Sequence, residues 1–511
     1  AQKPIDGSGD LTFTRASSAT RVNEQGLIET AAIIGDELVV NGDFATDSDW
    51  TKGTGWTISG GTANCDGTSS ICYQNIGITS NTSYSISFTL SNYISGTFRL
   101  MINGSPNVQS TTVNSNGNYH FYLNSDAAPN GNFSLSSSSF VGSIDNVSVK
   151  EYTTANIPRI DYTNGCGQLL LEPQRTNLIT QSEDFSDSSW LKLENGTGLT
   201  PVITSNYGTS PDGTVNASRV VLDASAVSSS NFSMLRTNIA GLTNPHSSSI
   251  SIYLKSNTVS NYTLIWYNES LSPEEIVVTP TWQRYTLSNS SIANTNDRLQ
   301  IGLIAFGGAT SSDYADFSIY GAMLELGSYE TSYIPTSGTT VTRIQDTSTT
   351  TGLSSVIGQT EGAIFWDFIL PDYESTSTRN LFRLSETSNN YFDIFQNMGS
   401  NILSFRIKDT SGSASSVYTF SPTKNTTYKA LLNYADGDCT FYLNGTLVAT
   451  TSTPFNNAVV YNNIIYYGEY FRMQSFLLFT SKLSNELSID LTGTVHTSFN
   501  SLATSLGYTI V

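Results

Sequence analysis

The sequence is poor in charge. Asp, Glu, Lys and Arg make up 13% of its 511 residues, and 42 acidic residues outnumber 23 basic ones, which gives a net charge of −19. Such an acidic surface repels phosphate backbones and anionic membranes, so we expect no nucleic-acid partner. No apolar run reaches membrane-spanning length, and no basic-then-apolar signal peptide opens the chain. We therefore expect a soluble protein with no membrane insertion.

Cysteine and histidine are also scarce, with four cysteines and three histidines. No Cys-x-x-Cys pair occurs and the histidines lie far apart, so no zinc site can be assembled by spacing. Cys65 and Cys72 flank a short turn and could form a disulfide across a hairpin. Buried free thiols, in a chain made in a reducing cytoplasm, are the favoured alternative. We expect that no cofactor is required.

The remaining composition favours β structure. Apolar residues make up only 38% of the chain, but aromatic residues reach 11%, which a disordered chain would not contain. These apolar and aromatic fractions fit β-sheets that are rich in Tyr and Phe and expose one face of Ser, Thr and Asn to solvent. A chain of this length is expected to form three or four domains.

The strongest local signals of secondary structure in the sequence lie in residues 156–179. A turn signal at Asp161–Gly165 leads into the apolar run Leu169–Leu171, and the run stops at Glu172-Pro173 because proline ends a strand. The segment is predicted to be one short buried strand. Arg159, Glu172 and Arg175 flank it. They are either paired charges that fix its position or ordinary solvated charges at strand ends.

These residues carry a resemblance to a known family. The segments Leu11–Glu29, Pro158–Tyr162 and Leu169–Leu178 resemble a signature of bacteriophage virion proteins, chiefly tail fibres, tail-spike-like chains and other surface appendages. The match is specific over roughly sixty residues and looser elsewhere. In that family the two halves of the signature lie close together in the sequence. Here residues 38–151 separate them, which indicates an inserted module.

The resemblance implies a split domain organisation. Residues 1–37 and 152–178 would pack together as one platform, because an insertion at a loop tip leaves a fold intact when the ends of the insert lie close together. The predicted order is the platform, the insert at 38–151, a second module at 179–336, a linker at 337–351 and a last module at 352–511.

The insert has the period of an antiparallel sheet with one buried face. Tyr84, Ile86, Phe88 and Leu90 alternate with Ser and Thr, and a later strand runs into the turn signal Asn103-Gly104. The insert resembles jelly-roll carbohydrate-binding modules, whose opening and closing strands often hold structural calcium. Asp43 and Asp145 fall at the corresponding places. The favoured alternative is that each aspartate caps a turn.

The next module repeats this architecture. The segment Ser182–Trp190 parallels Asn41–Trp50, which predicts a second jelly roll. Residues 337–351 are rich in Ser, Thr and Gly and are predicted to form a linker.

The last module contains Asn444-Gly445, the strongest hairpin signal in the chain. It resembles a laminin-G-like, concanavalin-A-like lectin sandwich. Near the end of the chain, the spacing of Phe499, Leu502 and Leu506 predicts a short helix. The predicted fold class is therefore all-β: tandem antiparallel β-sandwiches, two of them jelly rolls and one concanavalin-like, on a small split platform.

A search for catalytic patterns finds none. Glycosidases on concanavalin-like sandwiches need two carboxylates on one face of a strand, and no Glu-x-Asp-x-x-Glu occurs. No nucleophile elbow or phosphate-cradling loop lies between a strand and a helix. We therefore expect a protein that is not an enzyme.

Binding is the expected activity, because sugars stack their C–H faces on aromatic rings. The candidate glycan-binding residues are Trp50, Trp56, Tyr73, Trp190 and Tyr267, each of which could equally be a core residue.

The resemblance implies a virion structural protein, a tail fibre or fibre-like appendage that binds host-surface glycans and contacts other virion proteins. A homotrimer is the common assembly of such fibres, although no heptad or collagen-like repeat requires it. The alternatives are a head-fibre or decoration protein with the same modules on the capsid, and a polysaccharide depolymerase.

Overall fold

The structure, a computed structural model, describes residues 12–268, 273–370, 379–385, 391–396, 402–408, 414–452, 460–468 and 471–493. Strands dominate it, and α1 (Asn485–Thr492) is the only helix in those ranges, so the all-β prediction is confirmed. No helix among these residues has the length and apolarity needed to cross a bilayer. The helix predicted around Phe499, Leu502 and Leu506 lies outside the described ranges. The chain divides into two compact units, one of residues 32–157 and one of residues 1–31 with 158–511.

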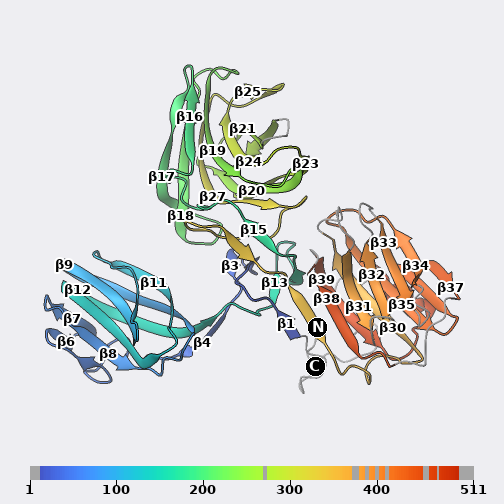
Figure 1. The fold of residues 1–511 in the computed structure, drawn as a ribbon, viewed down its shortest axis with the longest axis horizontal. Helices are drawn as coiled ribbons and strands as arrows, with labels where there is room; N and C mark the ends of the chain where they lie inside the picture. Colours follow the sequence, from blue (N-terminus) through green and yellow to red (C-terminus); the bar gives the residue numbers. More distant parts are fainter. Residues whose placement is uncertain are drawn as a thin grey trace. The chain divides into compact units, whose positions relative to one another are not determined.

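The unit 32–157 is the inserted module, drawn in blue to teal in Figure 1. Two long strands, β9 and β12, organise its sheet: β10, β11 and β12 pair with β9, and β4, β7 and β8 pair with β12. Its strands are β4 (Ile33–Glu37), β5 (Thr51–Lys52), β6 (Trp56–Ser59), β7 (Thr62–Asp66), β8 (Ile71–Asn75), β9 (Ser83–Gly104), β10 (Val108–Gln109), β11 (Gly117–Asn124) and β12 (Pro129–Thr153).

The insert begins earlier and ends later than the predicted 38–151. Strand β4, expected in the platform, pairs with β12 instead, with Ile34 opposite Tyr152. The backbone hydrogen bonds of this ladder hold the two ends of the insert together, so both belong to its sheet.

Within β9 the predicted alternation holds. Tyr84, Ile86, Phe88 and Leu90 are buried in the core of the insert, and Ser and Thr stand between them. The Asn103-Gly104 signal does not form a two-residue hairpin. Strand β9 runs through both residues, and the return strand β10 starts only at Val108. A tighter return would place Pro106 in the ladder, where it could not donate a hydrogen bond.

The second module, green to yellow in Figure 1, is a sandwich of two five-stranded sheets around one core. One sheet has the order β16-β19-β24-β21-β22 and the other β17-β18-β27-β20-β23. Its strands are β16 (Leu191–Asn195), β17 (Leu199–Thr209), β18 (Val215–Asp223), β19 (Phe232–Ala240), β20 (His246–Ser256), β21 (Tyr262–Tyr267), β22 (Glu274–Val278), β23 (Gln283–Ile292), β24 (Asn296–Leu303), β25 (Ala305–Phe306), β26 (Ala309–Thr310) and β27 (Tyr314–Leu326).

The internal repeat seen in the sequence is a repeated structure. The indole N–H of Trp50 donates to the carbonyl of Asn41 over 3.1 Å, and that of Trp190 donates to Gln181 over 2.8 Å, nine residues back in each case. Each indole also packs against a phenylalanine, Phe44 or Phe185. The motif therefore forms the same local structure near the start of each module, an indole packed against a phenylalanine and hydrogen-bonded to the backbone nine residues earlier.

The C-terminal sandwich has two seven-stranded sheets within the described residues, ordered β1-β29-β38-β31-β32-β33-β34 and β13-β14-β39-β30-β35-β36-β37. Its strands are β1 (Thr12–Thr14), β13 (Arg159–Asp161), β14 (Gln168–Leu171), β29 (Thr347–Thr350), β30 (Glu361–Ile369), β31 (Arg379–Ser385), β32 (Tyr391–Gln396), β33 (Leu403–Lys408), β34 (Ala414–Phe420), β35 (Thr427–Ala435), β36 (Cys439–Leu443), β37 (Thr446–Thr451), β38 (Asn463–Tyr467) and β39 (Phe471–Phe479).

The platform strands extend this sandwich. Strand β1 pairs with β29, and β14 pairs with β39, so each half of the phage-like signature adds to one sheet (Figure 1). Phe13 and Leu171 enter the same core. Both halves of the signature thus lie in one unit, each paired with a strand of the C-terminal sandwich.

Two small ladders accompany the platform strands, and we call these ladders and the platform strands together the junction. Strands β2 (Thr20–Val22) and β3 (Ile28–Thr30) form a hairpin, and β15 (Arg175–Asn177) pairs with β28 (Val341–Arg343). Residues 337–351, expected to be a linker, thus contain strands β28 and β29. These strands were not expected because their residues are mostly Ser and Thr, which in the sequence resemble a linker. Ser348 is nevertheless buried in the structure.

Candidate functional site

A buried ionic network holds the junction together. The Arg159 guanidinium donates to Glu172 over 2.6 Å and also pairs with Asp346. Arg15 donates to Asp346 over 2.9 Å, and Arg343 lies 2.8 Å from Glu172. Burial alone would raise the pKa of Glu172, but Arg343 and Arg159 outweigh burial and hold that pKa well below its usual range. These charges come from strands and loops far apart in the sequence, so the network fixes how they pack.

The interpretation that the charges around Leu169–Leu171 are paired is confirmed for Arg159 and Glu172. Arg175 also has partners: its Nε lies 3.7 Å from a Glu325 carboxylate oxygen, and its guanidinium lies over the Tyr329 ring.

A second ion pair borders an open pocket. The Asp161 carboxylate accepts from Arg472 over 2.6 Å and from the backbone N–H groups of Val22 and Thr163. Thr20 donates to the carbonyl of Tyr333 over 2.5 Å. These bonds attach the β2–β3 hairpin to β13, to β39 and to the segment that leaves the second module.

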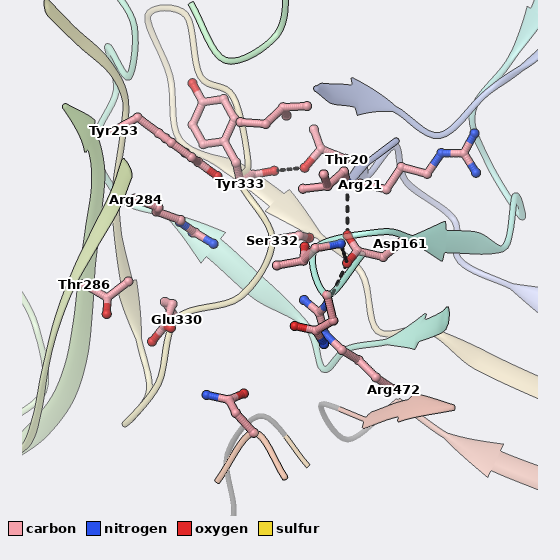
Figure 2. A pocket seen from close by; sticks show the side chains of 15 residues that line it. Thr20, Arg21, Asp161, Tyr253, Arg284, Thr286, Glu330, Ser332, Tyr333 and Arg472 are labelled. Carbon is pink, nitrogen blue, oxygen red and sulfur yellow. Dashed lines mark hydrogen bonds and ion pairs between the residues drawn. The ribbon is translucent and has the colours of Figure 1, made fainter. Parts of the chain in front are cut away.

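The pocket between these elements has a volume of about 510 Å³. Figure 2 shows Tyr253, Arg284 and Thr286 of the second module along one side, with Asp161 and Arg472 opposite. Burial raises the pKa of the Tyr253 hydroxyl, which therefore stays neutral. Its described lining residues are Thr20, Arg21, Val22, Ile28, Asp161, Thr163, Asn164, Tyr253, Arg284, Thr286, Glu330, Ser332, Tyr333, Asn425 and Arg472.

A second pocket of about 440 Å³ adjoins the first and shares Val22, Ile28, Tyr253 and Arg284 with it. Its wall includes Trp282, whose indole N–H donates to the carbonyl of Thr209 over 3.0 Å. We call the two pockets together the junction groove. It contains aromatic rings and hydrogen-bonding side chains, and none of its described lining residues is histidine or cysteine.

Strands β20 and β23 position the groove's side chains. Ile250, Ile252 and Leu254 face the core, so the intervening Tyr253 and Lys255 face outward. Tyr253 is opposite Arg284 in the ladder, which places Trp282 and Arg284 on the same outer face.

The structure buries three of the predicted glycan-binding residues. Trp50 and Trp56 lie in the core of the insert, and Trp190 lies in the core of the second module, with exposed fractions of 6%, 4% and 1%. Stacking on a sugar needs an exposed ring face, so their burial favours the core role.

Tyr73 and Tyr267 are half-buried and lie in different modules. Tyr73 is on β8 opposite Thr51. The Tyr267 hydroxyl accepts from Gln300 over 2.5 Å, and its ring stacks on Phe306. Neither tyrosine lines the junction groove, and a role for either in binding stays a prediction.

The predicted calcium pair consists of two aspartates with local hydrogen bonds. Asp43 accepts from the N–H of Ala45 over 3.4 Å, and Asp145 accepts from the N–H of Asn146 over 2.6 Å. The opening and closing segments do meet, since Val147 donates to the carbonyl of Gly42. Within the described ranges no cluster of three or more His, Cys, Asp or Glu side chains could hold a metal ion. Structural calcium at Asp43 and Asp145 stays a prediction.

Cys65 and Cys72 are both buried free thiols. They lie on different strands, β7 and β8, which pair with separate stretches of β12. Burial raises the pKa of the Cys72 thiol to about 12, so it stays protonated.

The sequence did contain a signal for the groove. Once Ile250, Ile252 and Leu254 are assigned to the core, period two places Tyr253 and Lys255 on the outer face. What the sequence does not reveal is that the β2–β3 hairpin, far away in the chain, lies against that face. Leu27 and Ile28 of this hairpin line the second pocket.

No protein-family model matches the sequence, and no curated protein matches it significantly. Solved structures share parts of the fold. The binding domain of botulinum neurotoxin serotype D has 14% identity and a TM-score of 0.24, over 29% of this chain and 41% of that one. The CBM22 tandem domain of Paenibacillus barcinonensis Xyn10C has 11% identity and a TM-score of 0.22, over 57% and 98% of the two chains. The enzymatically active domain of bacteriophage CBA120 tailspike protein 4 has 11% identity and a TM-score of 0.22, over 30% and 21%.

Proposed function

We propose that this chain is a structural protein of a bacteriophage virion, a tail fibre or fibre-like appendage that binds host-surface glycans without catalysis. The phage-like signature supports the virion role. Its two halves, interrupted in the sequence, join one folded unit with the second module and the C-terminal sandwich. The implied homotrimer and contacts with other virion proteins stay predictions.

The junction groove is the observation that carries the binding function. It combines the rings of Tyr253 and Trp282 with polar side chains from three parts of the chain. Sugar rings present apolar C–H faces and hydroxyl groups, and sites that bind them need both kinds of contact. The ionic network around Arg159 holds these parts in fixed positions, so the groove is formed before a ligand arrives.

The carboxylates of the groove support binding rather than hydrolysis. A glycosidase uses two carboxyl groups that flank the scissile bond. Asp161 is 2% exposed and already accepts from Arg472 and two backbone N–H groups. Glu330 is the other carboxylate among the described lining residues. A single accessible carboxylate does not supply the acid and base pair.

A glycan array probed with the intact chain tests the binding function. We expect binding to at least one bacterial surface polysaccharide, with no reducing sugar released from the bound polymer. Absence of binding across the array would overturn the glycan-binding function, and release of reducing ends would overturn its non-catalytic character. Antibody labelling of the chain on virions, viewed by electron microscopy, distinguishes a tail position from a capsid position.

A further inference from the structure

We propose that the 440 Å³ pocket of the junction groove binds an acidic sugar residue, with its carboxylate at Lys255 and Arg284 and its ring against Trp282. This inference rests on the proposed glycan-binding function and names the class of sugar.

The charge of the pocket is unusual for this chain. Its described lining contains two cationic side chains, Lys255 and Arg284, and no carboxylate, although acidic residues outnumber basic ones by 42 to 23 overall. Lys255 makes no ion pair with any described residue. A local positive site in an otherwise acidic chain attracts an anionic group. The pocket therefore fits one anionic group carried by a sugar.

Aromatic rings hold the two cations in place. The Lys255 ammonium lies 5.5 Å from the centre of the Trp282 ring, and the Arg284 guanidinium lies 5.6 Å from the centre of the Tyr253 ring. Arg284 also donates to Ser251 and to the carbonyl of Thr331. Contacts of this kind fix the cations beside apolar surface, and a carboxylated sugar presents both an anion and apolar C–H groups.

Part of the pocket's lining is apolar and attached to the same module. The N–H of Ile28 donates to the carbonyl of Pro211 over 2.9 Å, which ties the β2–β3 hairpin to the second module. Ile28 is buried in an apolar cluster against which Tyr253 and Trp282 pack, and Leu27 lines the pocket beside them. A sugar ring in the pocket would rest its C–H groups on this apolar surface.

Carboxyl reduction of polysaccharides provides the test, because it converts each uronic or sialic acid residue to its neutral form and leaves the polymer otherwise unchanged. Binding of the intact chain to acidic bacterial polysaccharides and to their carboxyl-reduced forms is measured by biolayer interferometry. The variants are Lys255→Met and, as a matched control, Lys408→Met. The Lys408 ammonium lies 5.4 Å from the centre of the Tyr391 ring in the C-terminal sandwich, outside the groove.

We expect at least one acidic polysaccharide to bind, and binding to weaken about tenfold on carboxyl reduction and about tenfold in Lys255→Met, the usual effect of losing one charge-assisted contact. Lys408→Met should bind like the unmodified chain, and added salt should weaken binding. Equal binding to reduced and acidic forms, or unchanged binding by Lys255→Met, would overturn the acidic-sugar site while the glycan-binding function stands. Displacement by inorganic phosphate with no effect of carboxyl reduction would assign the pocket to phosphate groups and also overturn it. Absence of binding to every form would overturn the acidic-sugar site, and absence of binding across the glycan array as well would overturn the glycan-binding function.

Discussion

The Arg159 guanidinium lies 2.6 Å from the Glu172 carboxylate, and neither side chain is exposed to solvent. Removing one partner of a buried pair leaves the other charge without compensation, which costs about 3–5 kcal/mol. Arg159→Met should therefore destabilise the junction by that amount. Hydrogen exchange measured by mass spectrometry reads each region separately. Protection of β13, β14 and β39 should fall by a factor of about 100 or more.

The control for this change is Arg21→Met. Arg21 lies 2.8 Å from Glu29, but both side chains are partly exposed, and exposed pairs contribute about 0–1 kcal/mol. Exchange in β9 and β12 of the insert should stay the same in both variants. If Arg159→Met changes exchange no more than Arg21→Met does, the buried network does not hold the junction.

Asp367 should make the C-terminal sandwich less stable as the pH rises. Burial raises the pKa of its carboxyl from 3.8 to about 6, and Lys429 opposes this shift only in part. Between those two pKa values the folded state binds more protons than the unfolded state, so stability is full below about pH 4 and is lost as the pH rises to 6. The loss is about 3 kcal/mol. Asp367→Asn should remove this pH dependence and raise stability at pH 7.

Unfolding of the intact chain and of Asp367→Asn in urea, between pH 4 and pH 8, measures this effect. Asp438→Asn serves as control, because that carboxylate is 62% exposed. A parallel pH dependence in the intact chain and Asp367→Asn would contradict the assignment.

Trp190 and Trp282 should respond differently to truncation. Trp190 is 1% exposed and its indole N–H is hydrogen-bonded, so Trp190→Ala should cost about 3–5 kcal/mol of stability. Trp282 is half-buried on the groove wall, so Trp282→Ala should lower glycan binding with a smaller loss of stability. Thermal unfolding and array binding measured on the same preparations separate the two effects. Equal stability losses would contradict the distinction between core and groove.

Replacing Gly445 by any residue with a side chain should lower the stability of the fold. Asn444 and Gly445 have φ values of 47° and 81° in the hairpin between β36 and β37. The left-handed region costs a residue with a Cβ about 1–2 kcal/mol. Gly445→Ala should lower stability by about that amount, whereas Gly208→Ala, with no positive φ and open space around it, should cost less. Midpoints of urea unfolding compare the two variants, and equal midpoints would contradict the turn assignment.

Local patterns in the sequence predicted much of the fold. The alternation of Tyr84 to Leu90 predicted which face is buried, because period two needs only neighbouring residues. The same dipeptide gave two outcomes: Asn444-Gly445 closes a tight hairpin, while Asn103-Gly104 does not, since Ser105-Pro106 follows it.

Long-range pairing was outside the reach of sequence patterns. Strand β1 pairs with β29, which lies far along the chain at Thr347–Thr350, and Leu169–Leu171 pairs with β39. Nothing local in Thr12–Thr14 indicates its partner. The groove was missed for the same reason, because its walls come from Leu27, Trp282 and other residues that only the fold brings together. The tryptophans chosen as ligand contacts proved to be buried, since the sequence does not show which aromatic rings are covered.

Hydrogen exchange of the intact chain, with and without host-surface polysaccharide, tests glycan binding at the junction groove most directly. We expect the polysaccharide to slow exchange in the β2–β3 hairpin, in β20 near Tyr253 and in β23 near Arg284. Slowed exchange confined to other strands, or no change anywhere, would contradict it.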